Sequence, residues 1–276
     1  MRYGFVTCVQ LGLSCMEAIY AAERKLALAI TLPDDVAPHK SGRVFLDKFC
    51  ELHTVPLVKS SNINNSDVLT AIHNAKLDYL FIIGWSQIAG DDVVDAPRNG
   101  CLGMHPTLLP QGRGRAAIPW AILKGLDKTG VTLFRLSKEV DRGSILGQLE
   151  IPMAPDIDAT DLYKKVCDTH VQLMIDVLPK LESGDIRDHI QNDALASHWP
   201  GRKPEDGAIN ISGSVKEAER LVRAVTKPYP GAFVIQGNKK LVIWKAAIID
   251  NPADRFSINF YDGTLQPIEF ELVNLF

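Results

Sequence analysis

The stretch Leu77–Trp85, LDYLFIIGW, is a continuous apolar run about as long as one strand. Strands buried on both faces of a parallel sheet carry such runs, because helices cover the sheet on either side. Short apolar runs of this kind alternate with segments of helical spacing through the first two thirds of the chain. The predicted strands are Tyr3–Val9, Leu26–Leu32, Tyr79–Ile83, Cys101–His105, Val131–Leu136 and Ile145–Ile151. We therefore predict an α/β fold with a mostly parallel sheet.

Helices are predicted between these strands wherever apolar residues recur every three or four positions. They cover Leu13–Ala22, Ser66–Asn74, Ala117–Leu123 and a long segment from about Asp158 to Leu178. Pro179 should end the long helix, because proline lacks the backbone N–H that an interior helical position donates.

The last third of the chain has a different pattern. From Ser183 to Asp206 the periodicity disappears, which is typical of a connector on the surface. A helix is predicted over Val215–Val225, and β-rich runs follow it, with hairpin turns at Gly237-Asn238 and Asp262-Gly263. We therefore predict an α/β domain over residues 1–184, a connector over 185–206 and a small β-rich C-terminal domain over 207–276.

The composition of the 276-residue chain is that of a globular protein, with 46% hydrophobic and 23% charged residues. Its 30 Lys and Arg against 33 Asp and Glu argue against general nucleic-acid binding, although a local basic patch is compatible with this overall charge. The five scattered cysteines predict buried thiols of a reducing compartment. Apolar stretches are too short to span a bilayer, and the N-terminus lacks a leader-like apolar region, so we expect a soluble, cytoplasmic enzyme.

The residues from Gly100 to Trp120, GCLGMHPTLLPQGRGRAAIPW, hold the first candidate site. A predicted strand ends on His105, and ligands bind at such strand ends in open parallel sheets. His105 is therefore either an active-site group that titrates near neutral pH or a packed histidine hydrogen-bonded to a turn. The glycines that follow match a dinucleotide fingerprint only superficially, since that motif directly follows the first strand. Arg113 and Arg115 either bind a phosphate or carboxylate or are solvated in a flexible loop.

The second candidate stretch is TGVTLFRLSKEVDRGSILGQLEIP, from Thr129 to Pro152. Asp141 lies before Gly143, between two predicted strands. Such an aspartate is either part of a turn or, beside His105, a carboxylate that orients the imidazole and stabilises its protonated form. Zinc-ligand spacing, phosphate-binding loops and serine-nucleophile motifs are absent from the sequence. The residues alone thus indicate an α/β enzyme with a histidine-centred site.

Together these two stretches resemble the formyltransferase family that uses N10-formyltetrahydrofolate. HPTLLPQGRGRAAIPWAILKG is similar to the family's His-Pro-Ser-Leu-Leu-Pro segment and the arginine-glycine loop after it, and GVTLFRLSKEVDRGSILGQ to its later Asp-x-Gly-x-Ile segment. Residues 206–246 resemble the region after the catalytic domain in methionyl-tRNA and sugar formyltransferases. The resemblance spans residues 1 to about 247 and implies a Rossmann-like formyltransferase fold, with 1–184 as the catalytic domain.

The resemblance also implies a catalytic set, which in the family is Asn-x-His with a later Asp. His105 and Asp141 match it, and they imply a general base assisted by a carboxylate. Gly103 stands where the family has Asn, whose side chain helps to hold the formyl oxygen, and losing one such donor typically costs ~10²–10³ in rate. Either another donor substitutes, or the enzyme is slow, or the chain is an inactive ligand-binding homologue. If the glycine merely vacates the position, Gly103→Asn should raise kcat.

Further site residues follow from the resemblance alone. The pterin ring of the co-substrate would lie against Trp85, Ser86, Gln87, Ile88, Ser137, Lys138, Glu139 and Val140. Trp85 is equally compatible with a core aromatic. Candidate contacts to the acceptor are Gln10, Thr107, Arg113 and Arg115. The family implies no metal.

Within the family the acceptor amine belongs to a nucleotide-linked amino sugar, to aminoacylated initiator tRNA or to glycinamide ribonucleotide. The purine enzymes lack the region around residues 231–246 and rank last. A tRNA enzyme needs excess positive charge, whereas residues 207–276 hold 8 Lys and Arg against 7 Asp and Glu. The prediction is therefore a nucleotide-linked amino-dideoxy sugar, with methionyl-tRNA formyltransferase as the alternative. No membrane partner is expected, and a homodimer stays open.

Overall fold

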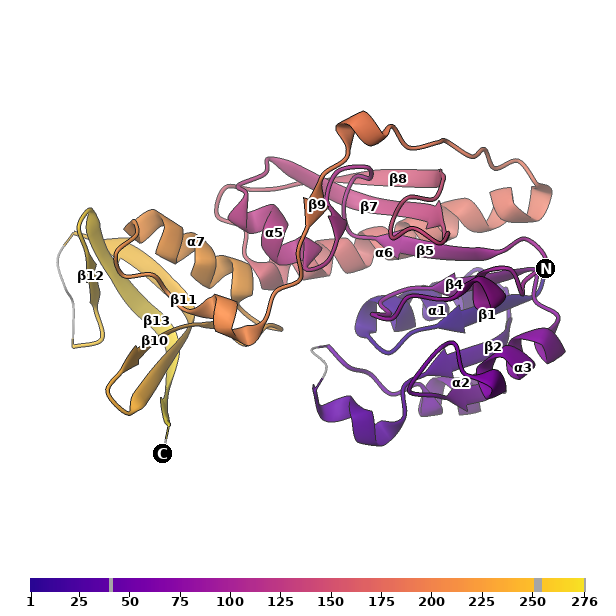
Figure 1. Cartoon of the computed structure of the whole chain (residues 1–276), viewed down its shortest axis with the longest axis horizontal. Helices are drawn as coiled ribbons and strands as arrows, with labels where there is room; N and C mark the ends of the chain where they lie inside the picture. Colours follow the sequence, from indigo (N-terminus) through magenta and orange to yellow (C-terminus); the bar gives the residue numbers. More distant parts are fainter. Residues whose placement is uncertain (40–41, 251–254, 276) are drawn as a thin grey trace. The chain divides into compact units, whose positions relative to one another are not determined.

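A seven-stranded sheet is the central element of the N-terminal part of the chain (Figure 1). The computed structural model describes residues 1–39, 42–250 and 255–275. The strands are β1 (Tyr3–Val6), β2 (Leu26–Thr31), β3 (Leu57–Lys59), β4 (Tyr79–Ile82), β5 (Cys101–His105), β7 (Lys128–Arg135) and β8 (Ile145–Pro152). Their order is β3-β2-β1-β4-β5-β7-β8; the first five pair in parallel, and β5 pairs with β7 in antiparallel orientation. The prediction of an α/β fold with a mostly parallel sheet is confirmed.

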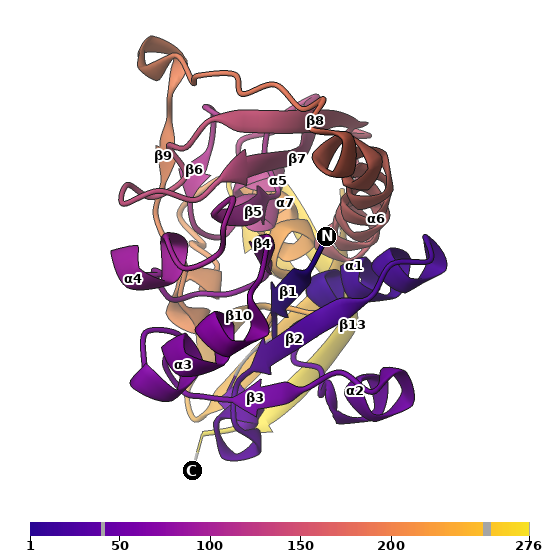
Figure 2. The same ribbon diagram turned by 90° about the vertical axis from the view of Figure 1, so that its right-hand side faces the viewer.

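Helices cover both faces of this sheet. They are α1 (Gln10–Ala21), α2 (Asp47–His53), α3 (Ser66–Ala75), α4 (Asp91–Val94) and α6 (Ala159–Ser183). In Figure 2, α1, α2 and α6 lie on one side of the strands, and α3 and α4 lie on the other. This arrangement leaves the carboxyl ends of the parallel strands free to carry the loops of a site.

The run LDYLFIIGW becomes β4 and the turn that follows it. Leu80 and Phe81 are fully buried although their side chains point to opposite faces, as the continuous apolar pattern predicts. Leu80 belongs to a core cluster that also contains Ile30 of β2 and Val68 and Ile72 of α3. Fully burying one such side chain contributes roughly 1.5–3 kcal/mol, so this packing holds α3 on the sheet.

The long helix α6 continues past Pro179 to Ser183, so the prediction that Pro179 ends it is wrong. The apolar stripe of the helix explains the difference, because Leu178 and Leu181 on either side of the proline are both buried. Their burial offsets the backbone hydrogen bond that the proline removes.

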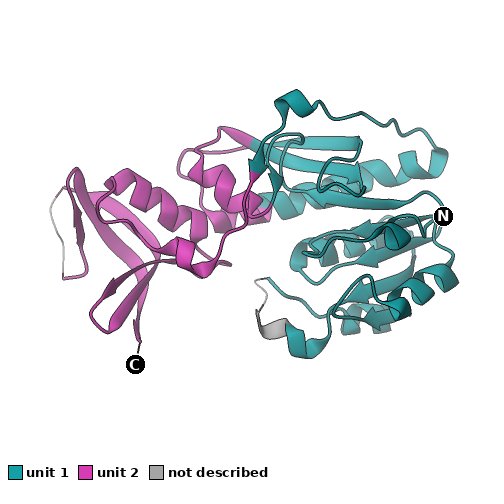
Figure 3. Cartoon of the chain, in the orientation of Figure 1, with its two compact units in different colours: residues 1–114, 129–151, 165–198 teal, residues 115–128, 152–164, 199–276 magenta. Residues whose placement is uncertain are grey.

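The chain divides into two compact units (Figure 3). Unit 1 consists of residues 1–114, 129–151 and 165–198, and unit 2 consists of residues 115–128, 152–164 and 199–276. The domain boundaries proposed at residues 184 and 206 stay a prediction.

Unit 2 contains α5 (Ala117–Leu123), α7 (Val215–Val225) and an antiparallel sheet of four strands. Its strands are β10 (Ala232–Gln236), β11 (Lys239–Ile249), β12 (Ile258–Phe260) and β13 (Gly263–Asn274), in the order β10-β11-β13-β12. The predicted turn at Gly237-Asn238 joins β10 to β11. The second turn is one residue earlier than predicted, at Tyr261-Asp262, since Phe260 pairs with Gly263. Asp262 is held in that turn because its Oδ1 accepts a hydrogen bond from the Val215 backbone N at 2.9 Å.

The aperiodic segment after α6 has local structure of its own. It contains one turn of 3-10 helix at Asp193–Leu195, the short strand β9 (His198–Trp199) and a second 3-10 turn at Pro204–Gly207. β9 forms a two-stranded sheet with β6 (Arg113–Gly114). Segments far apart in the sequence therefore meet next to the loop that follows β5.

The described ranges add two observations to the sequence interpretation. Cysteines 8, 15, 50 and 101 are buried free thiols, and burial raises the pKa of Cys50 to about 11, so its thiol stays protonated near neutral pH. None of the helices in these ranges combines the length and the apolar character that crossing a membrane requires.

Candidate active site

His105 is the last residue of β5, and Pro106 cannot continue the ladder because it lacks a backbone N–H. His105 is 8% exposed, and its Nε2 lies 2.8 Å from the carbonyl oxygen of Gly112. Because a carbonyl oxygen only accepts, Nε2 carries the proton of the neutral imidazole and Nδ1 carries the lone pair. Nδ1 is therefore the atom of His105 that can accept a proton.

Asp141 lies in the turn between β7 and β8, with a φ of 56°. Aspartate tolerates this left-handed conformation better than most residues. Its Oδ2 accepts a hydrogen bond from the Gly114 backbone N at 2.8 Å, and the same oxygen lies 3.8 Å from Nδ1 of His105. The two groups form an ion pair when the imidazole is protonated. The structure thus brings together two residues that the sequence alone could not place side by side.

Gly143 gives the Asp-x-Gly spacing a steric explanation. A Cβ at position 143 would lie 1.7 Å from the carbonyl oxygen of Arg135 on β7. Only glycine lets the turn approach the strand this closely. The path of the backbone that carries Asp141 is therefore fixed by direct packing on β7.

Two buried polar residues hold this turn from outside it. Nε2 of Gln191 donates to the carbonyl oxygens of Asp141 (2.8 Å) and Gly143 (2.7 Å), and its Oε1 accepts from Nε (3.1 Å) and an Nη atom (2.8 Å) of Arg113. Arg113 is 1% exposed and is also 2.8 Å from a carboxylate oxygen of Asp193. Gln191 could not be predicted from the sequence, since it lies in the aperiodic segment and no local pattern marks it.

A second buried histidine, His170 of α6, shares the electrostatic environment of His105. Its Nδ1 donates to the carbonyl oxygen of Val166 at 2.7 Å. Burial above all, and also the charge of a protonated His105, lower the pKa of His170 to about 4. His170 therefore stays neutral near pH 7 and adds no positive charge beside His105.

The residues predicted to contact the pterin lie on two loops joined by an ion pair. Nζ of Lys138, in the loop after β7, is 2.8 Å from a carboxylate oxygen of Asp91, at the start of α4. Ile88 and Val140 expose 65% and 51% of their surface, so both loops present apolar side chains to solvent. Trp85 packs against the core cluster described above, as its interpretation as a core aromatic requires.

Several of these loop residues also fix the loops internally. Oε1 of Gln87 accepts from the Ile63 backbone N at 3.0 Å, and the Ser137 hydroxyl donates to the Glu139 carbonyl oxygen at 3.1 Å. Ser86 is exposed. Their contact with a pterin stays a prediction. Within the described part of the chain, no group of three His, Cys, Asp or Glu residues has an arrangement that could hold a metal ion.

The four predicted acceptor contacts have different environments. Gln10, the first residue of α1, is exposed and donates through Nε2 to the Ser14 hydroxyl at 3.1 Å. Thr107 is 1% exposed, and its hydroxyl has no hydrogen-bond partner among the described atoms. Arg113 is buried as above, whereas Arg115 belongs to unit 2 and is exposed. Their roles toward an acceptor stay predictions.

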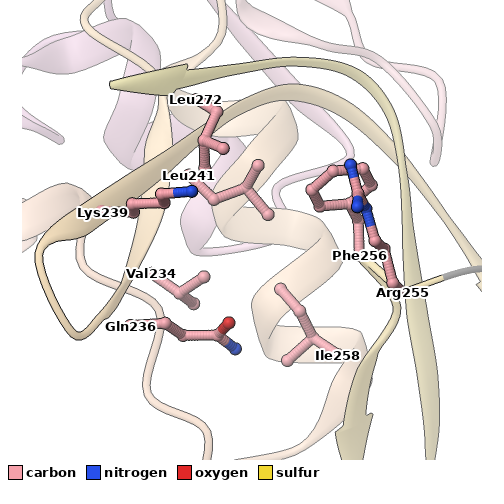
Figure 4. A pocket seen from close by; sticks show the side chains of 8 residues that line it. All are labelled: Val234, Gln236, Lys239, Leu241, Arg255, Phe256, Ile258 and Leu272. Atoms are coloured by element: carbon pink, nitrogen blue, oxygen red, sulfur yellow. The ribbon is translucent and has the colours of Figure 1, made fainter. Parts of the chain in front are cut away.

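A cavity of about 270 Å³ lies in unit 2 and contains none of these predicted site residues (Figure 4). Apolar side chains, among them Val234 and Leu241, line it together with the charged side chains of Lys239 and Arg255.

Two family models match the chain. The model of the formyl transferase family matches residues 17–178, and the model of the formyl transferase C-terminal domain matches residues 202–267. The chain belongs to the formyl transferase family.

Individual relatives agree with this assignment. The bifunctional polymyxin resistance protein ArnA of Wigglesworthia glossinidia brevipalpis is 33% identical over 238 residues, which is 86% of this chain but only 36% of that protein's length. An N-formyltransferase from Helicobacter canadensis, solved with folinic acid and dTDP-3-aminofucose, has a TM-score of 0.68 at 17% identity and covers 96% of this chain and 98% of its own. Methionyl-tRNA formyltransferase from Clostridium thermocellum has a TM-score of 0.67 at 15% identity and covers 99% of both chains. At these identities the two structures show the shared fold alone.

In this member of the formyl transferase family, apolar side chains fill the space beside Gly103. A Cβ at position 103 would lie 2.8 Å from Cδ2 of Leu136 and 3.2 Å from two ring carbons of Phe134. Gly103 and Phe134 are direct partners in the β5–β7 ladder. The glycine therefore does not leave a vacancy that an asparagine side chain would fill, and the expectation that Gly103→Asn raises kcat no longer has its structural basis.

Gly103→Asn is instead expected to destabilise the protein by about 1–3 kcal/mol without raising kcat, because the new side chain overpacks this position. The measurements are a melting curve and kcat with one acceptor. Gly103→Ala is the matched control, since it adds the same Cβ without an amide. A stable Gly103→Asn variant that is faster than both the parent and Gly103→Ala would show that a missing donor limits the rate.

Proposed function

We propose that this chain transfers the formyl group of N10-formyltetrahydrofolate to the amino group of a nucleotide-linked amino-dideoxy sugar. The observation that carries the proposal is the His105–Asp141 pair at the carboxyl end of β5. Nδ1 of His105 lies 3.8 Å from Oδ2 of Asp141, and each residue belongs to one of the two sequence motifs that resemble the family. The fit of the co-substrate is supported by the exposed apolar side chains of Ile88 and Val140, which offer a flat ring two apolar contacts.

The proposed reaction moves one proton through His105. As the neutral acceptor amine bonds to the formyl carbon, Nδ1 of His105 takes the proton that the amine nitrogen loses. The imidazolium is then held between the carbonyl oxygen of Gly112 and the carboxylate of Asp141, whose negative charge stabilises it. The same proton passes to N10 as the bond between N10 and the formyl carbon breaks. His105 returns to its neutral form, and the products are the formamide and tetrahydrofolate.

A second candidate function is a catalytically impaired ligand-binding homologue. It is favoured by Gly103, because glycine offers no side-chain donor to the formyl oxygen. Phe134 and Leu136 also fill the space beside Gly103. Removing one such donor from an acyl-transfer site typically lowers the rate by ~10²–10³-fold. Under the main proposal, a hydrogen-bond donor other than residue 103 stabilises the formyl oxygen.

Release of tetrahydrofolate, followed spectroscopically, separates the candidate functions. The acceptor panel contains dTDP-3-aminofucose, a uridine-linked amino sugar and aminoacylated initiator tRNA. We expect release with an amino sugar. Release only with the charged tRNA would make this a methionyl-tRNA formyltransferase, and binding of the co-substrate without release in any mixture would support the impaired homologue.

Binding measurements give an independent prediction about the acceptor. A nucleotide-linked amino sugar should raise the melting temperature, since it binds the native state only. Affinity for tRNA should be no better than non-specific, with Kd of roughly 10⁻⁴–10⁻⁶ M at physiological salt, because residues 207–276 have almost no excess positive charge. Tight, salt-sensitive tRNA binding without any effect of amino sugars would contradict this prediction.

A further inference from the structure

The side-chain amide of Gln191 uses every hydrogen bond that it can form. Both of its N–H groups donate to backbone carbonyl oxygens in the Asp141 turn, and its oxygen accepts two hydrogen bonds from Arg113. Gln191 is 9% exposed and Arg113 is 1% exposed, so water does not compete strongly for these partners. A fully satisfied, buried polar group of this kind has one well-defined position.

The two acceptors of Gln191 lie on either side of the sharpest part of the turn. One is the carbonyl of Asp141, whose φ of 56° is unfavourable for a residue with a side chain. The other is the carbonyl of Gly143, which packs directly on β7. Fixing both carbonyls fixes the backbone from which the Asp141 carboxylate reaches toward Nδ1 of His105.

Other contacts between the turn and the aperiodic segment are weaker candidates. Arg142 pairs with Asp193, but both side chains are more than 40% exposed. Exposed ion pairs contribute little to stability, because water and salt screen the two charges. The buried amide of Gln191 is therefore the contact best able to set the position of the turn.

We infer that Gln191 is a positioning residue, which acts through Asp141 to hold the carboxylate against His105, and that buried Arg113 serves as its anchor and not as an acceptor contact. The inference rests on the proposed function for its effect on rate. It also makes a structural claim that needs no activity, namely that the Asp141 carboxylate loses its fixed place when Gln191 no longer donates.

The variant that tests the inference is Gln191→Glu. A carboxylate still accepts from Arg113, so the buried guanidinium keeps its partner and the chain should fold. It cannot donate to the two carbonyl oxygens, so the turn is released. We expect kcat to fall ~10²-fold, the effect typical of a misplacement of about 1 Å, with the KM for the formyl donor within about threefold of the parent. Gln172→Glu is the matched control, since Gln172 is an exposed glutamine of α6 with one side-chain partner.

A double-variant comparison separates positioning from general stability. If Gln191 acts through Asp141, then Gln191→Glu should lower kcat less than about threefold in an Asp141→Asn background, because the group that it positions is already disabled. A merely structural role would lower kcat by the same factor in both backgrounds, and that result would overturn the inference.

Amide exchange at Gly114 provides the readout that is independent of activity. Its N–H donates to Oδ2 of Asp141, so its protection reports the position of the carboxylate. In Gln191→Glu we expect faster exchange at Gly114 and in residues 139–143, and unchanged exchange in α6. Parent-like exchange at Gly114 in folded Gln191→Glu would overturn the inference, even if the parent proved to transfer no formyl group. Faster exchange at Gly114 would support it in either case.

Discussion

Replacing His105 by asparagine is expected to lower turnover at least ~10²-fold, the lower end of what a general base contributes. The asparagine amide reaches only as far as the position of Nδ1, so the bond from Nε2 to the carbonyl oxygen of Gly112 is lost, but the pairing of β5 with β4 and β7 should keep the strand in place. Asparagine has no atom that takes up a proton near neutral pH, so the acceptor amine would lose its proton to water instead. The measurement is kcat with a single amino-sugar acceptor, alongside a melting curve.

His73→Asn is the control for this experiment, because His73 is an exposed residue of α3 and its loss should leave turnover unchanged. If a correctly folded His105→Asn variant retains turnover within about threefold of the parent, another group removes the proton, and the role assigned to Nδ1 is wrong.

Replacing Asp141 by asparagine is expected to lower turnover by a similar factor, at least ~10²-fold, for a different reason. The amide oxygen can still accept from the Gly114 backbone N, so the turn should persist. The negative charge that stabilises the imidazolium is lost, however, because the neutral amide oxygen now faces Nδ1 in place of the carboxylate. Proton uptake by His105 therefore loses its electrostatic support.

The affinity for the formyl donor should change little in Asp141→Asn, so the loss should be seen in kcat and not in KM. Asp185→Asn serves as the control, since Asp185 is an exposed aspartate of unit 1. A loss confined to KM would indicate that Asp141 binds the substrate and does not assist His105.

Most of the sheet could be predicted from local pattern, because an apolar run such as LDYLFIIGW has only one favourable environment in a parallel sheet. His105 could be predicted for a similar reason, since Pro106 ends the strand that carries it. The three-residue strand β3 was missed, as its residues are only half-buried and too few to form a pattern. Local signals also misplaced the end of α6, where burial outweighs the proline.

The supporting contacts of the site could not be predicted. Gln191 lies 50 residues from Asp141 and 78 residues from Arg113 in the sequence, and it reaches both through side-chain hydrogen bonds that leave no periodic trace. For the same reason the burial of Arg113 was not expected, since a loop arginine is normally solvated. Sequence motifs identified the proposed catalytic pair but not the groups that hold the pair in place.

The pairing of β6 with the segment around β9 has a practical consequence for dissecting the protein. The Arg113 backbone N donates to the carbonyl oxygen of Ser197 and the Gly112 backbone N to its hydroxyl, both at 2.9 Å. A fragment cut after residue 184 would retain the two motifs that carry His105 and Asp141, yet it would lose Ser197 and Gln191 and leave the Arg113 guanidinium without its partners. The smallest autonomous piece of this protein is therefore longer than these two motifs suggest, and any truncation or domain exchange should keep the aperiodic segment up to residue 198 with the N-terminal part.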